Sequence, residues 1–126
     1  MMEPSPYPFS QPAPSPNGNG GLADLATGPV ALRVVAGPDV GLGVLLMRDP
    51  ISTGRGRQNQ LVLTDRKVSR DHIRFELRDG FWVVQDLDSR NGTRLNGTPV
   101  KRGGLAIGDF VYLGDTILRV DAISEP

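Results

Sequence analysis

The stretch HIRFELRDGFWVVQDL, residues 72–87, decides the fold. Apolar and polar side chains alternate over residues 72–78, which is the period of a β-strand with one buried face. Asp79–Gly80 then supplies the residue pair that favours the positive φ angles of a tight hairpin turn. Residues 81–87 are apolar enough to form the returning strand. The stretch therefore predicts an antiparallel β-hairpin.

Similar strand and turn signals occur on both sides of this hairpin. Turn residues arrive every few positions, and no window of eleven or more residues carries an apolar stripe of helical period. A second tight turn is expected at Asn96–Gly97. We expect further strands at residues 31–35, 43–47, 51–53, 61–63, 105–107, 110–113 and 117–120. This pattern is typical of an all-β sandwich or barrel, in which a rigid frame holds functional loops.

The N-terminal segment has a different composition. Six of the eleven prolines fall within residues 1–20, and Ser, Gln, Asn and Gly fill most of the other positions. Such a segment does not repay the entropy of ordering. We therefore expect a disordered Pro/Gly/Ser-rich tail over residues 1–28 and one folded domain over residues 29–124. Thr27 is either an unmodified linker residue or, once phosphorylated, a ligand for a second molecule, and the sequence leaves both open.

Composition excludes several classes of chemistry. The chain of 126 residues has no Cys and one His, so it lacks disulfides, thiolate nucleophiles and a multi-histidine metal site. We expect no metal and no cofactor. Fourteen Lys and Arg balance fourteen Asp and Glu, which gives no overall basic field for nucleic acid. No apolar run reaches the roughly 18 residues of a membrane span, and a monomeric cytoplasmic protein without membrane insertion is the default expectation.

Local charge differs from this neutral total. Nine of the fourteen cations lie between Arg55 and Arg94, in or near three predicted loops at residues 53–60, 65–72 and 88–97. These loops also contain Ser hydroxyls, Asn amides and backbone amides freed by Gly. Guanidinium groups, hydroxyls and N–H groups are the donors that a phosphate group needs. The loops are therefore the candidate ligand-binding region.

Catalytic and nucleotide-binding motifs are incomplete. Gly54 and Gly56 resemble half of a nucleotide-binding glycine loop, but a third Gly and a following helix are missing. Ser69 and His72 suggest a nucleophile and a base, yet the strand–turn–helix elbow of hydrolases is absent. We therefore expect a protein that is not an enzyme.

Three short blocks occur in a specific order along the chain: Gly54–Arg55, then Ser69-x-x-His72, then Asn91-Gly92-Thr93-x-x-Asn96-Gly97. Together with the strands between them they resemble the forkhead-associated (FHA) domain, and the resemblance covers residues 30–123. It implies a β-sandwich of about eleven strands whose apical loops bind phosphothreonine peptides.

The resemblance also implies a role for each motif residue. Arg55 would contact the phosphate, Ser69 would donate its hydroxyl to it, and Arg70 would add a second contact. Asn91 would bind the main chain of the ligand, beside a contact from Arg90. Architectural roles are implied for Gly54, His72, Gly92, Asn96 and Gly97.

The expected function is phosphothreonine-dependent recruitment of partners that a Ser/Thr protein kinase has phosphorylated. One alternative is a phosphate-independent interaction scaffold that uses a sheet face. Nucleic-acid binding through the same arginines is a further alternative, and steep salt dependence would reveal it. The absence of aromatic residues from the three loops argues against stacking on single strands, so we expect no nucleic-acid partner.

Overall fold

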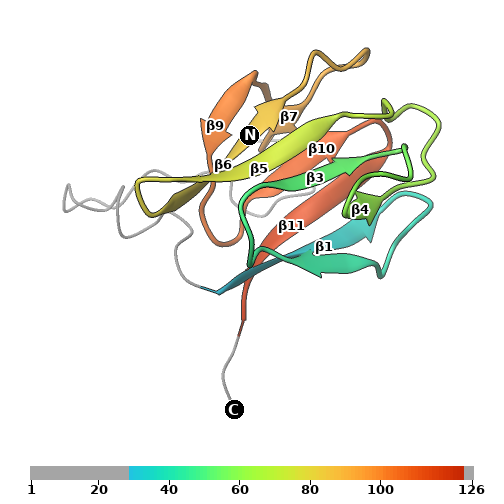
Figure 1. The fold of residues 1–126 in the computed structure, drawn as a ribbon. Helices are drawn as coiled ribbons and strands as arrows, with labels where there is room; N and C mark the ends of the chain where they lie inside the picture. The colour runs from blue at the N-terminus through green and yellow to red at the C-terminus, as the bar shows by residue number, and fades with distance from the viewer. Residues whose placement is uncertain (1–28, 124–126) are drawn as a thin grey trace, which may run out of the picture.

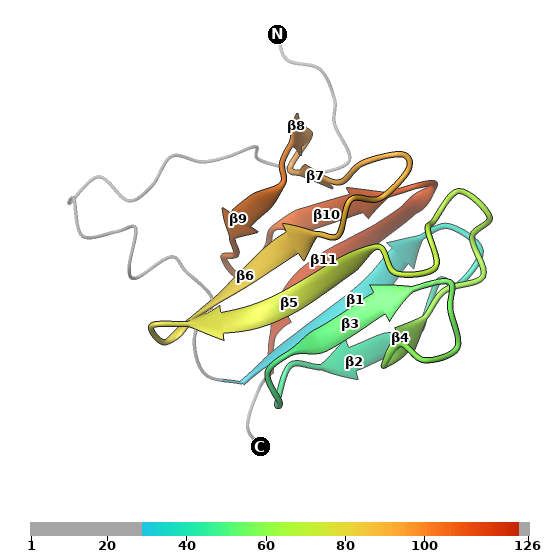
Figure 2. The same cartoon turned by 45° about the horizontal axis from the view of Figure 1, so that its top comes forward.

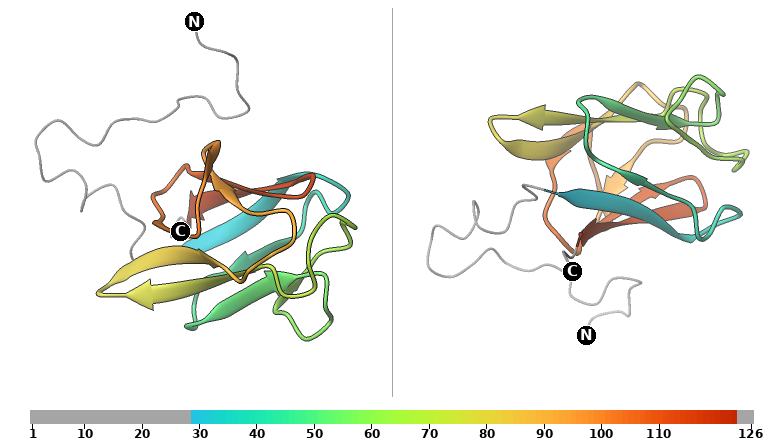
Figure 3. Two further views of the ribbon diagram at one scale, coloured as in Figure 1. Left: turned by 90° about the horizontal axis from the view of Figure 1, so that it is seen from above. Right: turned by 60° about the horizontal axis from the view of Figure 1, so that its bottom comes forward.

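The computed structural model describes residues 29–123, which form two β-sheets packed face to face (Figures 1 and 3). The expected tail, including Thr27, lies outside the described residues. The strands in chain order are β1 (Val30–Ala36), β2 (Gly43–Leu45), β3 (Ile51–Gly54), β4 (Leu61–Val62), β5 (Ile73–Arg78), β6 (Phe81–Asp86), β7 (Arg94–Leu95), β8 (Thr98–Pro99), β9 (Arg102–Gly104), β10 (Phe110–Leu113) and β11 (Thr116–Ala122).

The strands divide unequally between the two sheets. One sheet has six strands in the order β2-β1-β11-β10-β7-β8, and the other has five in the order β4-β3-β5-β6-β9. All neighbours pair antiparallel except β3 and β4, which are parallel. The β-sandwich of about eleven strands that the FHA resemblance implies is confirmed.

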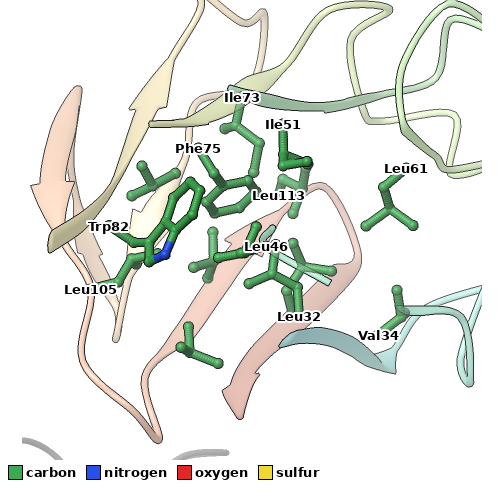
Figure 4. Packing of buried hydrophobic residues seen from close by; sticks show 14 of the residues in the cluster. Leu32, Val34, Leu46, Ile51, Leu61, Ile73, Phe75, Trp82, Leu105 and Leu113 are labelled. Atoms are coloured by element: carbon green, nitrogen blue, oxygen red, sulfur yellow. The ribbon is translucent and has the colours of Figure 1, made fainter. Parts of the chain in front are cut away.

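The space between the sheets is filled by large apolar side chains. Figure 4 shows Phe75 and Trp82 from the five-stranded sheet packed with Leu32 and Leu113 from the six-stranded sheet. All four are at most 3% exposed. Complete burial of one such side chain stabilises the fold by about 1.5–3 kcal/mol. This shared core fixes the two sheets relative to each other. The loops that connect their strands are therefore held in fixed positions as well.

The predicted central hairpin is present as β5 and β6. Leu77 pairs with Trp82 across it, and the turn residues Asp79 and Gly80 have φ angles of 53° and 86°. Asn96 and Gly97 form the second turn, between β7 and β8, with φ angles of 52° and 90°. Both Asn/Asp–Gly pairs therefore adopt the left-handed conformation that two-residue hairpins require.

One predicted strand is wrong. Residues 105–107 were expected to be extended, but the strand that follows β8 is β9, at Arg102–Gly104. Gly103 carries no side chain, and a Cβ there would lie 2.9 Å from Leu95 Cδ2. The Leu95 side chain of β7 thus lies close to β9 at Gly103, while Leu105 turns into the core and donates its amide to Trp82 O at 2.9 Å.

The described residues contain no helix that is long and apolar enough to cross a membrane.

Candidate functional site

Three loops meet at one end of the sandwich, where β3 and β6 end and β5 begins. They are the β3–β4 loop (residues 55–60), the β4–β5 loop (residues 63–72) and the β6–β7 loop (residues 87–93). Figure 2 shows all three on the right of the molecule, opposite the β5–β6 hairpin. They contain every basic and polar residue for which the sequence predicts a ligand contact.

The β3–β4 loop is bonded directly to the β4–β5 loop. Arg55 N donates to Ser69 O at 2.9 Å, and Gly56 N donates to Arg70 O at 3.0 Å. The Arg55 side chain donates through Nε to Val68 O at 2.9 Å, which orients the guanidinium. Its two terminal nitrogens have no partner among residues 29–123, and the residue is exposed. They are therefore available to an external anion.

Gly54 permits this close contact between the two loops. A Cβ at position 54 would clash with Arg70 O and would lie 2.9 Å from Ser69 O. The requirement is steric, because Gly54 does not have a positive φ. Any larger residue would push the backbone of Ser69 and Arg70 away from Arg55.

Asn59 adds a connection that the sequence analysis missed. Its Nδ2 donates to Gly56 O and to Arg70 O, both at 2.7 Å, and the residue is 6% exposed. A single amide thus closes the β3–β4 loop and fixes it to the β4–β5 loop. A buried Asn between two arginine-rich segments is not distinguishable from a solvated loop Asn by sequence pattern alone.

His72 connects the second loop to the third. Its Nδ1 accepts from Ser69 N at 2.9 Å, so the ring hydrogen is on Nε2, which donates to Gly92 O at 2.9 Å. Burial lowers the pKa of His72, although the bond to Gly92 and the charge of Asp86 act in the opposite direction. The ring is therefore a neutral brace between the two loops.

Ser69 and Asn91 each keep one polar group free for a ligand. Ser69 Oγ accepts from Arg90 N at 3.0 Å, which leaves the hydroxyl hydrogen to donate elsewhere. Asn91 Nδ2 donates to Lys67 O at 2.8 Å, which leaves its amide oxygen as an acceptor. A hydroxyl donor suits a phosphate oxygen, and a fixed carbonyl oxygen suits a peptide N–H.

The third loop is shaped by a buried carboxylate. Asp86, at the end of β6, accepts from Ser89 N at 3.0 Å, from Ser89 Oγ, and from Thr93 Oγ1 at 2.7 Å. Burial alone would raise the pKa of Asp86, but these hydrogen bonds outweigh burial and lower it. The carboxylate stays ionised and holds residues 87–93 in one conformation. Gly92, with φ of 84°, completes the bend.

All five predicted ligand contacts lie at this end. Arg55 N bonds Ser69 O, and Arg90 N bonds Ser69 Oγ. The Asn91 side chain is attached to the same loop through Lys67 O. The Arg70 and Arg90 side chains are exposed and have no hydrogen-bond or ionic partner within the described part of the chain. Asn96 lies farther away, where it bonds Asp109 and Phe110 N and fixes the β7–β8 turn.

Comparison with known proteins gives the same class of fold. A family model described as the cytoplasmic domain of an inner membrane component of the type III secretion system (Yop-YscD), which is of FHA type, matches residues 33–124. The glycogen accumulation regulator GarA of Mycolicibacterium smegmatis is 39% identical over 94 residues, which are 75% of this chain and 60% of GarA. The oxoglutarate dehydrogenase inhibitor of Corynebacterium glutamicum is 33% identical over 94 residues, 75% of this chain and 66% of that protein. The chain thus spans about three fifths of the length of the first of these relatives.

Solved structures agree with these relatives. A chain from a structural and functional analysis of phosphothreonine-dependent FHA domain interactions has a TM-score of 0.70 and 31% identity, with 78% of this chain and 100% of that chain covered. The FhaA FHA domain, solved in complex with the intracellular domain of Rv3910, has a TM-score of 0.66 and 33% identity, with 72% and 98% covered.

Fold and loops together define a β-sandwich of the kind that presents a binding site on loops at one end. The chain belongs to the FHA domain family.

Proposed function

We propose that the chain is a phosphothreonine-binding module that recruits partners phosphorylated by a Ser/Thr protein kinase. The observation that carries the proposal is the set of unused donors at one end of the sandwich: the Arg55 terminal nitrogens and the Ser69 hydroxyl hydrogen, with the Asn91 amide oxygen beside them. The FHA relatives support it, since one solved relative is described by phosphothreonine-dependent interactions.

The chemistry of the ligand fits these groups. Phosphothreonine at neutral pH carries about −1.5 to −2 charge and three acceptor oxygens. Arg55 would donate N–H groups from its planar guanidinium to the phosphate, Ser69 would donate its hydroxyl, and Arg70 would add positive charge. Hydrogen bonds to charged groups contribute about 1.5–3 kcal/mol each. An unphosphorylated peptide loses all of them, so the phosphate acts as a switch for binding.

The threonine methyl group adds a smaller preference. Burial of one methyl group contributes about 0.8 kcal/mol, or roughly fourfold in affinity. Because the contact area of a short peptide is small, we expect micromolar affinity for the phosphothreonine form.

Calorimetric titration of four samples tests the proposal: a phosphothreonine peptide, its phosphoserine and unmodified forms, and the phosphothreonine peptide with an Arg55→Ala variant. We expect the variant to bind roughly 10- to 100-fold more weakly, which corresponds to one lost charged bond. Equal binding of the unmodified peptide, or unchanged binding by the variant, would refute the proposal.

A second candidate function uses the outer face of the six-stranded sheet. A shallow groove of about 490 Å³ lies there, lined in part by Ala31, Leu45 and Ile107. Leu45 and Ile107 are 49% and 46% exposed, which favours contact with a partner that does not depend on phosphate. A Leu45→Glu substitution that abolishes partner binding while the phosphopeptide affinity is unchanged would identify this mode.

The proposal takes residues 29–124 as the binding domain and treats the preceding 28 residues as a separate segment. The match of the family model to residues 33–124 supports this division. A cytoplasmic location is part of the same proposal, and the names of its relatives, a glycogen accumulation regulator and an oxoglutarate dehydrogenase inhibitor, support it.

A further inference from the structure

Five exposed arginines surround the loop site without an acidic partner. None of them forms an ion pair with another residue in the described part of the chain, although six pairs between Lys or Arg and a carboxylate occur in it. They are Arg55, Arg57, Arg66, Arg70 and Arg90.

Most acidic groups of these loops and their neighbours are already engaged. Asp65 is 3% exposed and accepts from Thr116 Oγ1 at 2.7 Å, and Asp115 is paired with Lys67 at 3.2 Å. Asp86 is buried, and Asp39 accepts hydrogen bonds from Thr64 N and Thr64 Oγ1. None of these four carboxylates forms an ion pair with any of the five arginines.

Two acidic side chains on the loops remain exposed. Asp71 accepts from Gln58 Nε2, and Asp88 has no side-chain partner within residues 29–123. Five unpaired arginines and two exposed aspartates thus lie on these loops, so exposed cationic side chains outnumber exposed carboxylates there. A single phosphate group does not use this many cations.

Two of the arginines lie on different loops of the site, Arg57 on the β3–β4 loop and Arg66 on the β4–β5 loop. Arg57 follows Gly56, whose amide is bonded to Arg70 O on the β3–β4 side. Arg66 precedes Lys67, whose carbonyl holds the Asn91 amide on the β6–β7 side. Neither is among the residues for which a phosphate contact is predicted. Both are therefore exposed, unpaired cations on the site loops that remain for residues flanking the phosphothreonine.

We propose that the ligand of this site is a phosphothreonine segment flanked by acidic residues, and that Arg57 and Arg66 are the specificity-determining residues that select it. The inference rests on the proposed function, because it describes the neighbours of the phosphothreonine. Exposed ion pairs are individually weak and are screened by salt. The preference therefore amounts to roughly two- to fivefold in affinity for each contacting pair.

Affinities of three phosphothreonine peptides for the full chain test this inference. The peptides share one core and carry Ala, Glu or Lys on both sides of the phosphothreonine. We expect the Glu-flanked peptide to bind about four- to 25-fold tighter than the Ala-flanked one when both arginines are engaged, and the Lys-flanked one to bind weakest. Raising the salt concentration should reduce these differences.

Variants assign the effect to the two arginines. The Arg57→Gln/Arg66→Gln double variant should bind the Ala-flanked peptide within about twofold of the parent while the Glu preference disappears. Arg48→Gln is the matched control, because Arg48 is also exposed and unpaired among the described residues but precedes β3 at the opposite end. It should leave the preference unchanged.

The outcomes separate the two levels of the proposal. Equal binding of all three phosphopeptides would overturn the acidic preference and leave phosphothreonine binding intact. Absence of binding to all three would refute the proposed function itself. Displacement of the Glu-flanked phosphopeptide by an equal concentration of an unrelated oligonucleotide would assign the arginines to nucleic acid and overturn the inference.

Discussion

Arg55 owes its suitability as a phosphate contact to the atoms that hold it. Arg55 N donates to Ser69 O and Arg55 Nε donates to Val68 O, so the backbone and the guanidinium of this residue are both held before a ligand arrives. Little conformational freedom is therefore lost when an anion binds. The free terminal nitrogens then present a planar fork. A lysine at this position would keep the charge but would lose the bond to Val68 and the fork geometry.

Arg55→Lys is therefore expected to weaken phosphothreonine binding by at least about tenfold although the net charge is unchanged, since one charged bond contributes about 1.5–3 kcal/mol. Fluorescence anisotropy with a labelled phosphopeptide measures the loss, and a melting curve verifies that the variant is folded. Wild-type affinity in Arg55→Lys would mean that charge alone, without geometry, determines binding.

Asn59 is the residue whose role depends most on tertiary structure. Asn59→Ala removes two side-chain hydrogen bonds, to Gly56 O and Arg70 O, which then keep only the backbone donors Asn59 N and Gly56 N. At about 0.5–1.5 kcal/mol for each bond, we expect a loss of about 1–3 kcal/mol in the free energy of unfolding. Denaturant unfolding gives this value. Phosphopeptide affinity should fall as well, because the loop with Arg55 loses its attachment. A variant with unchanged stability would show that the amide bonds are dispensable.

At the scale of secondary structure, the sequence predicts most strands but not all of their positions. Alternation over residues 72–78 and the turn pair Asp79–Gly80 predict the β5–β6 hairpin because both signals are local. The strand predicted at residues 105–107 is wrong, because a short apolar run is also typical of a loop that turns into the core, as Leu105 does. The strand that forms instead, β9, contains Gly103, which has no side chain and can therefore lie close to Leu95.

The binding loops likewise contain residues whose roles the sequence predicts and residues whose roles it does not. Arg55, Ser69 and Asn91 are predictable through their short motifs, whereas Asn59 and Asp86 act through partners that only the folded chain brings near. No periodicity marks a polar residue that is buried at a strand end.

Alanine substitutions at two glycines distinguish an effect on ligand binding from an effect on stability alone. Gly54→Ala forces the β3 end away from Arg70 O, so we expect both reduced stability and a loss of phosphopeptide affinity. Gly80→Ala is the matched control: it has φ of 86° and open space around it, so only the strain of the left-handed conformation applies, about 1–2 kcal/mol. Paired melting and binding curves distinguish them. If Gly80→Ala lost affinity to the same degree, local loop geometry would not explain the effect.

At the scale of the whole molecule, three buried titratable groups couple stability to pH. Burial lowers the pKa of His72 from its usual 6.5, so the unfolded chain binds a proton that the folded chain does not. Burial alone would raise the pKa of Asp65 and Asp86, yet their hydrogen bonds lower it below the usual 3.8. In all three cases stability is present above the unfolded pKa and is lost as the pH falls.

The free energy of unfolding should therefore decline as the pH is lowered through about 6.5, with a slope of up to about 1.4 kcal/mol per unit for one proton. A further decline is expected below 3.8. Burial raises the pKa of Asp109, which opposes the second decline. Urea titrations at several pH values measure both. His72→Gln should lack the first, and the NMR titration of the His72 ring in the wild type should show its lowered pKa. A flat stability profile between about pH 7.5 and 5 would contradict this account.

The central claim is that three loops from different strands form one phosphate site, and NMR mapping of a phosphothreonine-peptide titration tests it most directly. The account predicts that the largest amide shifts fall at Arg55, Gly56, Arg70 and Arg90, together with the Asn91 side-chain amide, and that the unphosphorylated peptide produces none of them. Shifts confined to β1, β2 and β11 around the sheet-face groove, with the loops unperturbed, would contradict it.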